Sequence, residues 1–193
     1  EDGSFYHNDA FLNAVAHTRK HNSDLHITGL LGDGGVHSHI NHQLALLEFA
    51  KRAGVKQVYL HVFTDGRDTL PRSGAGFLAD LEAGIARIGI GVIATVTGRY
   101  YAMDRDKRWE RTELAYALFT NAEGKKHASL QEAIIDARLD KETDEFIKPI
   151  INANVADTKI KDGDVVICFN FRTDRCREIT QVLTQTDMPD FEM

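Results

Sequence analysis

Short apolar runs alternate along this chain with segments in which apolar residues recur every three or four positions. The runs predict buried strands, and the periodic segments predict amphipathic helices. The predicted strands are Leu25–Leu31, Gln57–Phe63, Gly91–Val96 and Asp164–Phe169, with a further candidate at Phe146–Ile151. The predicted helices are Asp9–His21, Ile40–Ala53, Ser73–Ile88, Arg105–Phe119, Leu130–Leu139 and Thr173–Thr184.

Three helix ends carry local signals. Asn8 is a suitable N-cap for the first helix, Gly54 is placed to end the second, and Ser129 with Glu132 forms a capping box. Strands that alternate with helices indicate an α/β protein with a three-layer α/β/α fold and a largely parallel central sheet. The sequence has no repeat or linker, so we expect residues 1–193 to form a single domain.

Composition narrows the class of protein. The 193 residues suffice for one domain with a full core, and the net charge of −6 argues against a nucleic-acid-binding surface. No apolar stretch reaches membrane-spanning length, and the first residues lack a signal-peptide pattern, so we expect no membrane partner. Cys168 falls in a predicted strand and Cys176 in a predicted helix, which makes a disulfide framework improbable. We expect a monomeric, cytoplasmic protein.

A polar motif follows each of the four main strands. The motifs are GDGGVHSH (32–39), TDGRD (64–68), TGRYYAMDRDKRW (97–109) and NFRTDR (170–175). If the strands are parallel, all four motifs leave the same edge of the sheet, where open α/β sheets bind ligands. The residues that would converge there are His37, Arg67, Asp68, Arg99, Arg105, Arg172 and Arg175. Local arginines on an acidic protein predict a site for a small, multiply charged anion.

Each arginine motif also has a simpler interpretation. In NFRTDR, Thr173 or Asp174 would cap a helix, so that Arg172 and Arg175 lie on its first turn beside free N–H groups that bind anions. The alternative is a surface ion-pair cluster. TDGRD is either a charged turn or a loop whose Asp68 stays ionised and accepts a proton. We expect Arg108 to lie on a helix surface.

The glycine-rich motif permits two interpretations. It lacks the Gly-Lys-Ser/Thr of a phosphate loop and the third glycine of a dinucleotide fingerprint. His37, His39 and His42, with Asp33, could bind Zn²⁺ or Mn²⁺, although no standard ligand spacing supports this. The alternative is one functional histidine and two on a helix surface. No serine has the context of a nucleophile.

Taken in order, GLLGDGGVHSH, HVFTDGRD, TGRYYAMDRDKRW and FNFRTDR resemble the motifs of the cofactor-independent (2,3-bisphosphoglycerate-independent) phosphoglycerate mutases. The resemblance covers nearly the whole chain. It implies a two-domain enzyme in which an alkaline-phosphatase-like domain carries two Mn²⁺ or other divalent ions and a nucleophilic serine. This chain resembles only the inserted substrate-binding domain, so the resemblance implies no metal or cofactor here and an isolated domain that is inactive.

The resemblance also implies roles for individual residues. The substrates would be 3-phosphoglycerate and 2-phosphoglycerate, interconverted through a phosphoserine on the metal-binding domain. The substrate contacts would be His37, Arg67, Asp68, Arg99, Arg105, Arg172 and Arg175. Asp68 would be the acid/base for the glycerate hydroxyls, and His37 would lie beside the substrate. Two alternatives remain: a stand-alone module that binds small anions, and a metal hydrolase that uses His37, His39 and His42.

Overall fold

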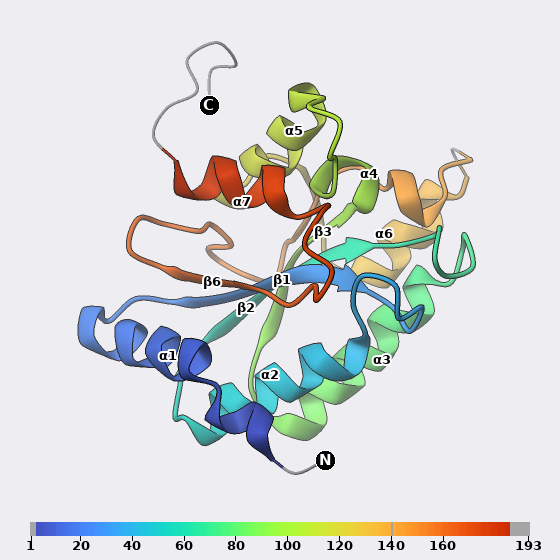
Figure 1. Ribbon diagram of the computed structural model, residues 1–193. Coiled ribbons are helices and arrows are strands. Elements are labelled where there is room, and N and C mark those ends of the chain that lie inside the picture. Colours follow the sequence, from blue (N-terminus) through green and yellow to red (C-terminus); the bar gives the residue numbers. More distant parts are fainter. Residues whose placement is uncertain (1–2, 140, 186–193) are drawn as a thin grey trace.

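The computed structural model describes residues 3–139 and 141–185, and within them the central sheet has six strands in the order β4-β5-β3-β2-β1-β6 (Figure 1). The strands are β1 (Leu25–Leu31), β2 (Val58–Thr64), β3 (Val92–Gly98), β4 (Lys125–His127), β5 (Ile150–Asn152) and β6 (Val165–Cys168). The helices are α1 (Asp9–His21), α2 (Ile40–Arg52), α3 (Gly74–Ile88), α4 (Arg99–Ala102), α5 (Trp109–Thr120), α6 (Leu130–Ala137) and α7 (Arg177–Thr184), with 3-10 turns η1 (Ser4–His7) and η2 (Asp144–Phe146).

Helices cover both faces of the sheet, which confirms the predicted three-layer α/β/α fold. Helices α1, α2 and α3 lie on one face, and α4, α5 and α7 lie on the other (Figure 1). Because side chains alternate along a strand, neighbouring residues of one strand enter different cores. Val62 packs in the core beneath α2 and α3, whereas Phe63 packs with Phe119 beneath α5. No helix among residues 3–139 and 141–185 is long and apolar enough to cross a bilayer.

The sheet is largely parallel, as predicted. β6, β1, β2 and β3 pair in parallel, and β5 joins β3 in the antiparallel direction. The strand candidate Phe146–Ile151 appears as the shorter β5, because Asp144–Phe146 forms the turn η2. β4 was not predicted, since its sequence Lys-Lys-His has no apolar run and lies at the exposed edge of the sheet.

The three predicted helix-end signals are present. The side chain of Asn8 accepts hydrogen bonds from the N–H groups of the first turn of α1, and Ser129 Oγ accepts one from Glu132 N–H at 3.3 Å. Gly54 follows the end of α2 and donates its N–H to the carbonyl of Lys51 at 2.9 Å. These helix ends are fixed by neighbours in sequence, which explains why the sequence predicts them.

Two helix starts were predicted wrongly. The helix expected from Arg105 begins at Trp109, because the Asp104 carboxylate accepts the N–H groups of Asp106 and Arg108 at 2.9 and 3.0 Å and holds the segment as a turn. The helix expected from Thr173 begins at Arg177. The segment before it is again a turn, with Cys176 N–H donating to the carbonyl of Thr173 at 3.3 Å.

A chain of buried polar side chains runs from Asp164, just before β6, across β1, β2 and β3. Asp164 Oδ2 lies 3.2 Å from His26 Nε2, His26 Nδ1 lies 2.9 Å from His61 Nε2, and His61 Nδ1 lies 2.8 Å from the Thr95 hydroxyl. Burial lowers the pKa of His61 well below 6.5, and His26 lowers it further. Burial also lowers the pKa of His26, although Asp164 acts in the opposite direction. Both imidazoles are therefore neutral in the native protein at neutral pH.

The free energy of unfolding is expected to fall as the pH drops below about 6.5, where unfolded histidines bind protons that the native protein does not accept. His61→Gln should reduce this slope by up to about 1.4 kcal/mol per pH unit. Urea unfolding at several values between about pH 5 and 7.5 measures it. His42→Gln, at an exposed position, is the control. Equal pH slopes for the two variants would contradict the assignment to the buried chain.

Candidate anion-binding site

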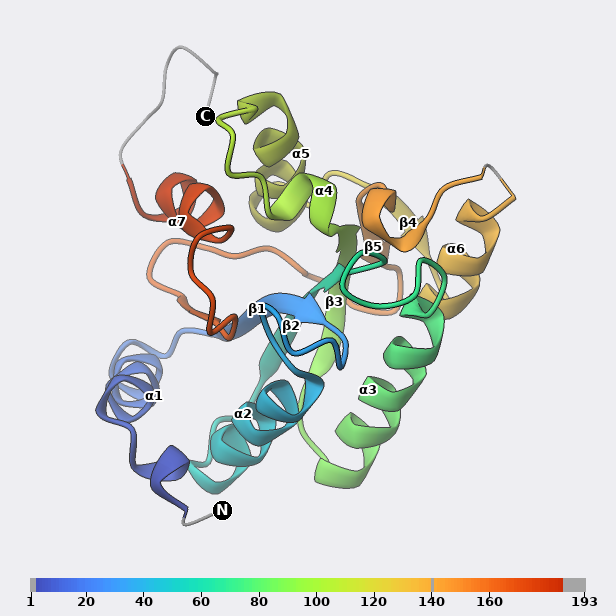
Figure 2. The same cartoon turned by 45° about the vertical axis from the view of Figure 1, so that its right-hand side comes forward.

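The motifs that follow β1, β2, β3 and β6 meet at the carboxyl edge of the sheet. The loops after β1 and β2 leave the sheet on the same side (Figure 2). Gly34 in the first of these loops lies so close to the second that an added Cβ would be 2.7 Å from the carbonyl oxygen of Asp68. The glycine of the β1 motif therefore allows one loop backbone to approach another.

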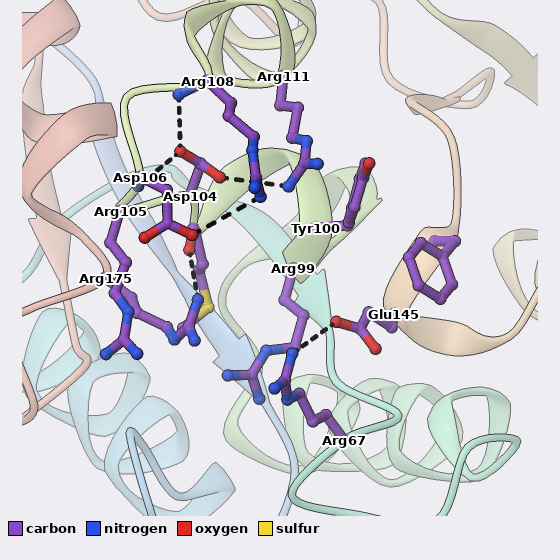
Figure 3. A pocket seen from close by; sticks show the side chains of 12 residues that line it. Arg67, Arg99, Tyr100, Asp104, Arg105, Asp106, Arg108, Arg111, Glu145 and Arg175 are labelled. Carbon is purple, nitrogen blue, oxygen red and sulfur yellow. Dashed lines mark hydrogen bonds and ion pairs between the residues drawn. The ribbon is translucent and has the colours of Figure 1, made fainter.

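A cavity of about 420 Å³ opens at this edge. Four of the predicted arginines line it, namely Arg67, Arg99, Arg105 and Arg175. Figure 3 shows the guanidinium groups of Arg67 and Arg99 close together on one side of the pocket and those of Arg105 and Arg175 on the other. The other lining residues are Tyr100, Met103, Asp104, Asp106, Arg108, Arg111, Glu145 and Phe146.

Arg99 is buried and lies between two carboxylates. Its Nη1 is 2.7 Å from Asp65 Oδ1 and 2.6 Å from Asp68 Oδ2. Burial acts to lower the pKa of Arg99, but the hydrogen bonds with Asp68 and Asp65 outweigh it, and the pKa is raised. Arg99 is therefore a permanent cation in a fixed orientation. It comes from α4, directly after β3.

Arg175 has a different environment. Its Nη1 donates to the carbonyl of Met103 at 3.3 Å, and no carboxylate of the described residues forms an ion pair with it. Burial lowers the pKa of Arg175, and repulsion from Arg105, Arg99 and Arg67 lowers it further. An anion in the pocket would relieve this repulsion, so the crowding of cations is itself a signal of an anion site.

The remaining predicted residues, His37, Asp68 and Arg172, lie beside the pocket and not in its lining. The imidazole of His37 is 3.8 Å from both Asp68 Oδ2 and Asp174 Oδ1. Asp174 also pairs with Arg105 at 2.7 Å and with Arg172 Nε at 3.1 Å. Burial lowers the pKa of His37, and the charge of Arg99 adds to this effect, so the ring is neutral at neutral pH. Asp174 thus connects His37 and Arg172 to the pocket, because it also pairs with the pocket residue Arg105.

Two expectations about the arginines were wrong. Arg172 and Arg175 do not lie on the first turn of a helix, because α7 begins only at Arg177. Arg108 lies not on the outer surface of a helix but at the N-cap of α5, where it lines the pocket and pairs with Asp106 at 3.6 Å. The convergence of the motifs was predicted, but the local conformation of their arginines was not.

Sequence reasoning missed two residues of the pocket wall, Glu145 and Arg111. Glu145 of η2 pairs with Arg67 at 3.3 Å, although nothing in its own sequence context indicates this. Arg111 stacks on the ring of Tyr100 at 3.8 Å and pairs with Asp104 at 3.4 Å. The position of Arg111 one helical turn after Arg108 could have indicated that Arg111 reaches the pocket. The contact of Glu145 could not be found in this way, because it depends on the pairing of β3 with β5.

The three histidines in and just after the first motif, His37, His39 and His42, do not form a metal site. His37 faces Asp68 and Asp174, His39 Nδ1 accepts the Asn41 N–H at the start of α2, and the ring of His42 packs against Phe171. Throughout the described part of the chain, no group of three or more His, Cys, Asp or Glu side chains could hold a metal ion. This arrangement contradicts the alternative of a metal hydrolase built on these residues.

Known proteins are similar to this chain in sequence and fold. Residues 1–193 match the family described as the BPG-independent PGAM N-terminus. A 2,3-bisphosphoglycerate-independent phosphoglycerate mutase of Chloroflexus aggregans is 52% identical over 190 residues, which are 97% of this chain and 35% of that protein. Its namesake in Clostridium perfringens strain SM101 is 48% identical over 194 residues, covering 100% of this chain and 38% of that protein. A crystal structure of Leishmania mexicana phosphoglycerate mutase at low cobalt concentration superposes with a TM-score of 0.89 at 33% identity, over 98% of this chain and 36% of that one.

The fold and the pocket define an α/β domain with an arginine-lined pocket at the carboxyl edge of its sheet. The chain belongs to the BPG-independent PGAM N-terminus family, and its relatives are 2,3-bisphosphoglycerate-independent phosphoglycerate mutases. It spans 35% to 38% of the length of these two relatives.

Proposed function

We propose that this chain is the substrate-binding domain of a phosphoglycerate mutase that interconverts 3-phosphoglycerate and 2-phosphoglycerate. One observation carries the proposal: Arg67, Arg99, Arg105 and Arg175 come from three separate motifs and line one cavity in a chain of this family. Guanidinium forks match the geometry of phosphate and carboxylate groups, and a phosphoglycerate has one of each. The pocket therefore fits a small anion with two charged ends.

The resemblance to the mutases, of whose length this chain covers 35% to 38%, supports a reaction that is divided between two domains. The arginines would hold the glycerate in line for attack, which supplies orientation rather than bond breaking. The serine that accepts the phosphoryl group, and the two Mn²⁺ or similar ions that stabilise charge on it, would belong to the metal-binding remainder of the enzyme. That remainder is the partner that this domain requires.

The proposed chemistry of this chain is proton transfer. As a glycerate hydroxyl attacks the phosphoserine, its oxygen forms the new bond to phosphorus, the bond to the serine oxygen breaks, and the hydroxyl proton passes to Asp68. In the first transfer the serine oxygen would form the bond to phosphorus while the bond to the glycerate oxygen breaks, and Asp68, protonated at that stage, would give its proton to the leaving oxygen. The later attack of the hydroxyl returns a proton to Asp68, so its carboxyl ends the cycle as it began. Asp68 is suited to this because its side chain is 19% exposed and its Oδ2 is fixed by Arg99. His37, 3.8 Å from the same oxygen, would orient the substrate hydroxyl.

The chain by itself is expected to bind 3-phosphoglycerate without isomerising it, because it supplies the arginine pocket but no phosphoryl acceptor. Titration followed by NMR would show shifts at the pocket residues, and an enolase-coupled assay would show no turnover. Adding the metal-binding remainder should restore activity. Binding without any restored mutase activity would favour the stand-alone anion-binding module. Turnover by the chain alone, free of contaminating enzyme, would refute the division of labour.

A further inference from the structure

Asp65 lies behind the pocket wall and accepts three hydrogen bonds through one carboxylate oxygen. Its Oδ1 is 2.7 Å from Nη1 of Arg99, 3.1 Å from the backbone nitrogen of Arg67 and 3.0 Å from that of Asp68. The residue is 3% exposed and does not line the cavity. Asp65 therefore contacts three residues of the candidate site without reaching a ligand in the pocket.

Two of these bonds set the conformation of the loop after β2. A carboxylate that accepts the N–H groups two and three residues ahead makes a local turn. Gly66 completes the turn with a positive φ of 69°, which a glycine adopts without strain. The turn fixes the backbone position of Asp68. It thereby also sets the direction from which the Asp68 carboxylate approaches Arg99.

The third bond concerns charge. Arg99 carries one positive charge and contacts two carboxylates, with side-chain exposures of 3% for Asp65 and 19% for Asp68. Charges attract strongly where water is excluded. Besides Arg99, Asp68 faces the His37 ring at 3.8 Å and has Asp65 and Arg67 in its own loop. Without the charge of Asp65, Asp68 would be the only anion on Arg99 Nη1 and would become its permanent counter-ion.

We propose that Asp65 is a positioning residue, which orients and neutralises Arg99 so that Asp68 stays free to exchange a proton with the substrate. This inference rests on the proposed function, because it takes proton transfer as the role of Asp68. The two carboxylates on Arg99 then have different tasks. The buried one balances the guanidinium, and the partly exposed one reacts.

Asp65→Asn in the full-length enzyme tests this role. Asparagine keeps an oxygen that can accept all three hydrogen bonds but removes the charge. We expect kcat to fall at least about tenfold, as for a weakened general base. Inorganic phosphate should compete with the substrate as well as it does in the wild type, within about threefold, because the arginines stay in place and lose no positive charge. A purely structural role would weaken phosphate binding and kcat together.

Asp164→Asn is the matched control. The side chain of Asp164 is only 6% exposed and accepts backbone N–H bonds from Asp24 and Lys161, but it lies at the opposite end of β6 from the pocket. Its variant should keep the wild-type kcat, whatever it loses in urea stability. Circular dichroism and urea unfolding show whether each variant is folded. If Asp65→Asn does not fold, Asp65→Ser replaces it, because the serine hydroxyl also accepts turn hydrogen bonds. The expected result is the same: a lower kcat with nearly unchanged competition by phosphate.

Two results would overturn the inference: a kcat within about threefold of wild type for the folded neutral variant, or a loss of phosphate affinity in step with kcat. If the wild-type enzyme does not interconvert phosphoglycerates, the proposed function fails and the role of Asp65 fails with it. If the wild type is active and Asp65→Asn is equally active, only the inference fails. The wild-type assay therefore separates the two cases.

Discussion

Asp68→Asn in the full-length enzyme is expected to lower kcat by about 10²–10⁴-fold, the range for loss of a general acid–base group, with a much smaller change in KM. The substitution keeps the size of the side chain and an oxygen for Arg99, but it removes the proton acceptor. The carboxylate lies 2.6 Å from Arg99 Nη1, its side chain is 19% exposed, and it lies beside the pocket that would hold the glycerate hydroxyls. Steady-state kinetics in both directions measures the effect.

Asp136→Asn, at an exposed position on α6, is the control and should leave both constants unchanged. Circular dichroism confirms that each variant is folded. If a folded Asp68→Asn enzyme kept a near-normal kcat and lost only affinity, Asp68 would position the substrate and the proton would have to pass through another group. His37 is the nearest candidate, at 3.8 Å from the same carboxylate.

The sequence predicts those parts of the fold that depend on local patterns. β1 and α1 were predicted with their observed bounds, because a buried strand between two covered faces is largely apolar and an N-cap is fixed by adjacent residues. β4 and the direction of β5 were not predictable in this way. β5 pairs with β3 through only Thr95–Ile151 and Val96–Ile150, a contact between residues far apart in the chain.

In the candidate site, too, the sequence predicts some features, whereas others depend on residues far apart in the chain. The topological rule brings the four motifs to one edge of the sheet, and the structure confirms this for the pocket arginines. The conformation of each motif depends instead on distant partners. The buried Glu178 accepts the N–H of Lys107 at 2.9 Å. This bond helps to keep the segment before Trp109 out of the helix, so that α5 begins at Trp109. That contact places Arg108 in the pocket wall. Neither the hydrophobic periodicity nor the helix propensity of the segment around Arg108 indicates this position.

Arg175→Ala should lower kcat/KM by at least about tenfold. Among the candidate-site arginines that are partly exposed to solvent, its removal should cause the largest loss of kcat/KM. A charge-assisted hydrogen bond contributes roughly 1.5–3 kcal/mol, and about 1.4 kcal/mol corresponds to tenfold. Arg175 is half-buried, and no carboxylate of the described residues forms an ion pair with it; burial and the repulsion from Arg105, Arg99 and Arg67 lower its pKa, although Asp174 acts in the opposite direction. The substrate would supply the missing counter-charge.

Arg172→Ala provides the comparison within the same motif. Arg172 is half exposed at 50%, and its Nε already bonds to Asp174 at 3.1 Å, so part of any gain on binding is offset by the loss of that pair. Its removal should therefore cost less than that of Arg175, and Arg87→Ala, on the exposed face of α3, should cost nothing. Substrate affinity of the wild type should also decrease with salt, and Arg175→Ala should make it less salt-dependent. Equal losses for Arg172 and Arg175 would show that the pairing of Arg172 with Asp174 does not determine which arginine binds the substrate.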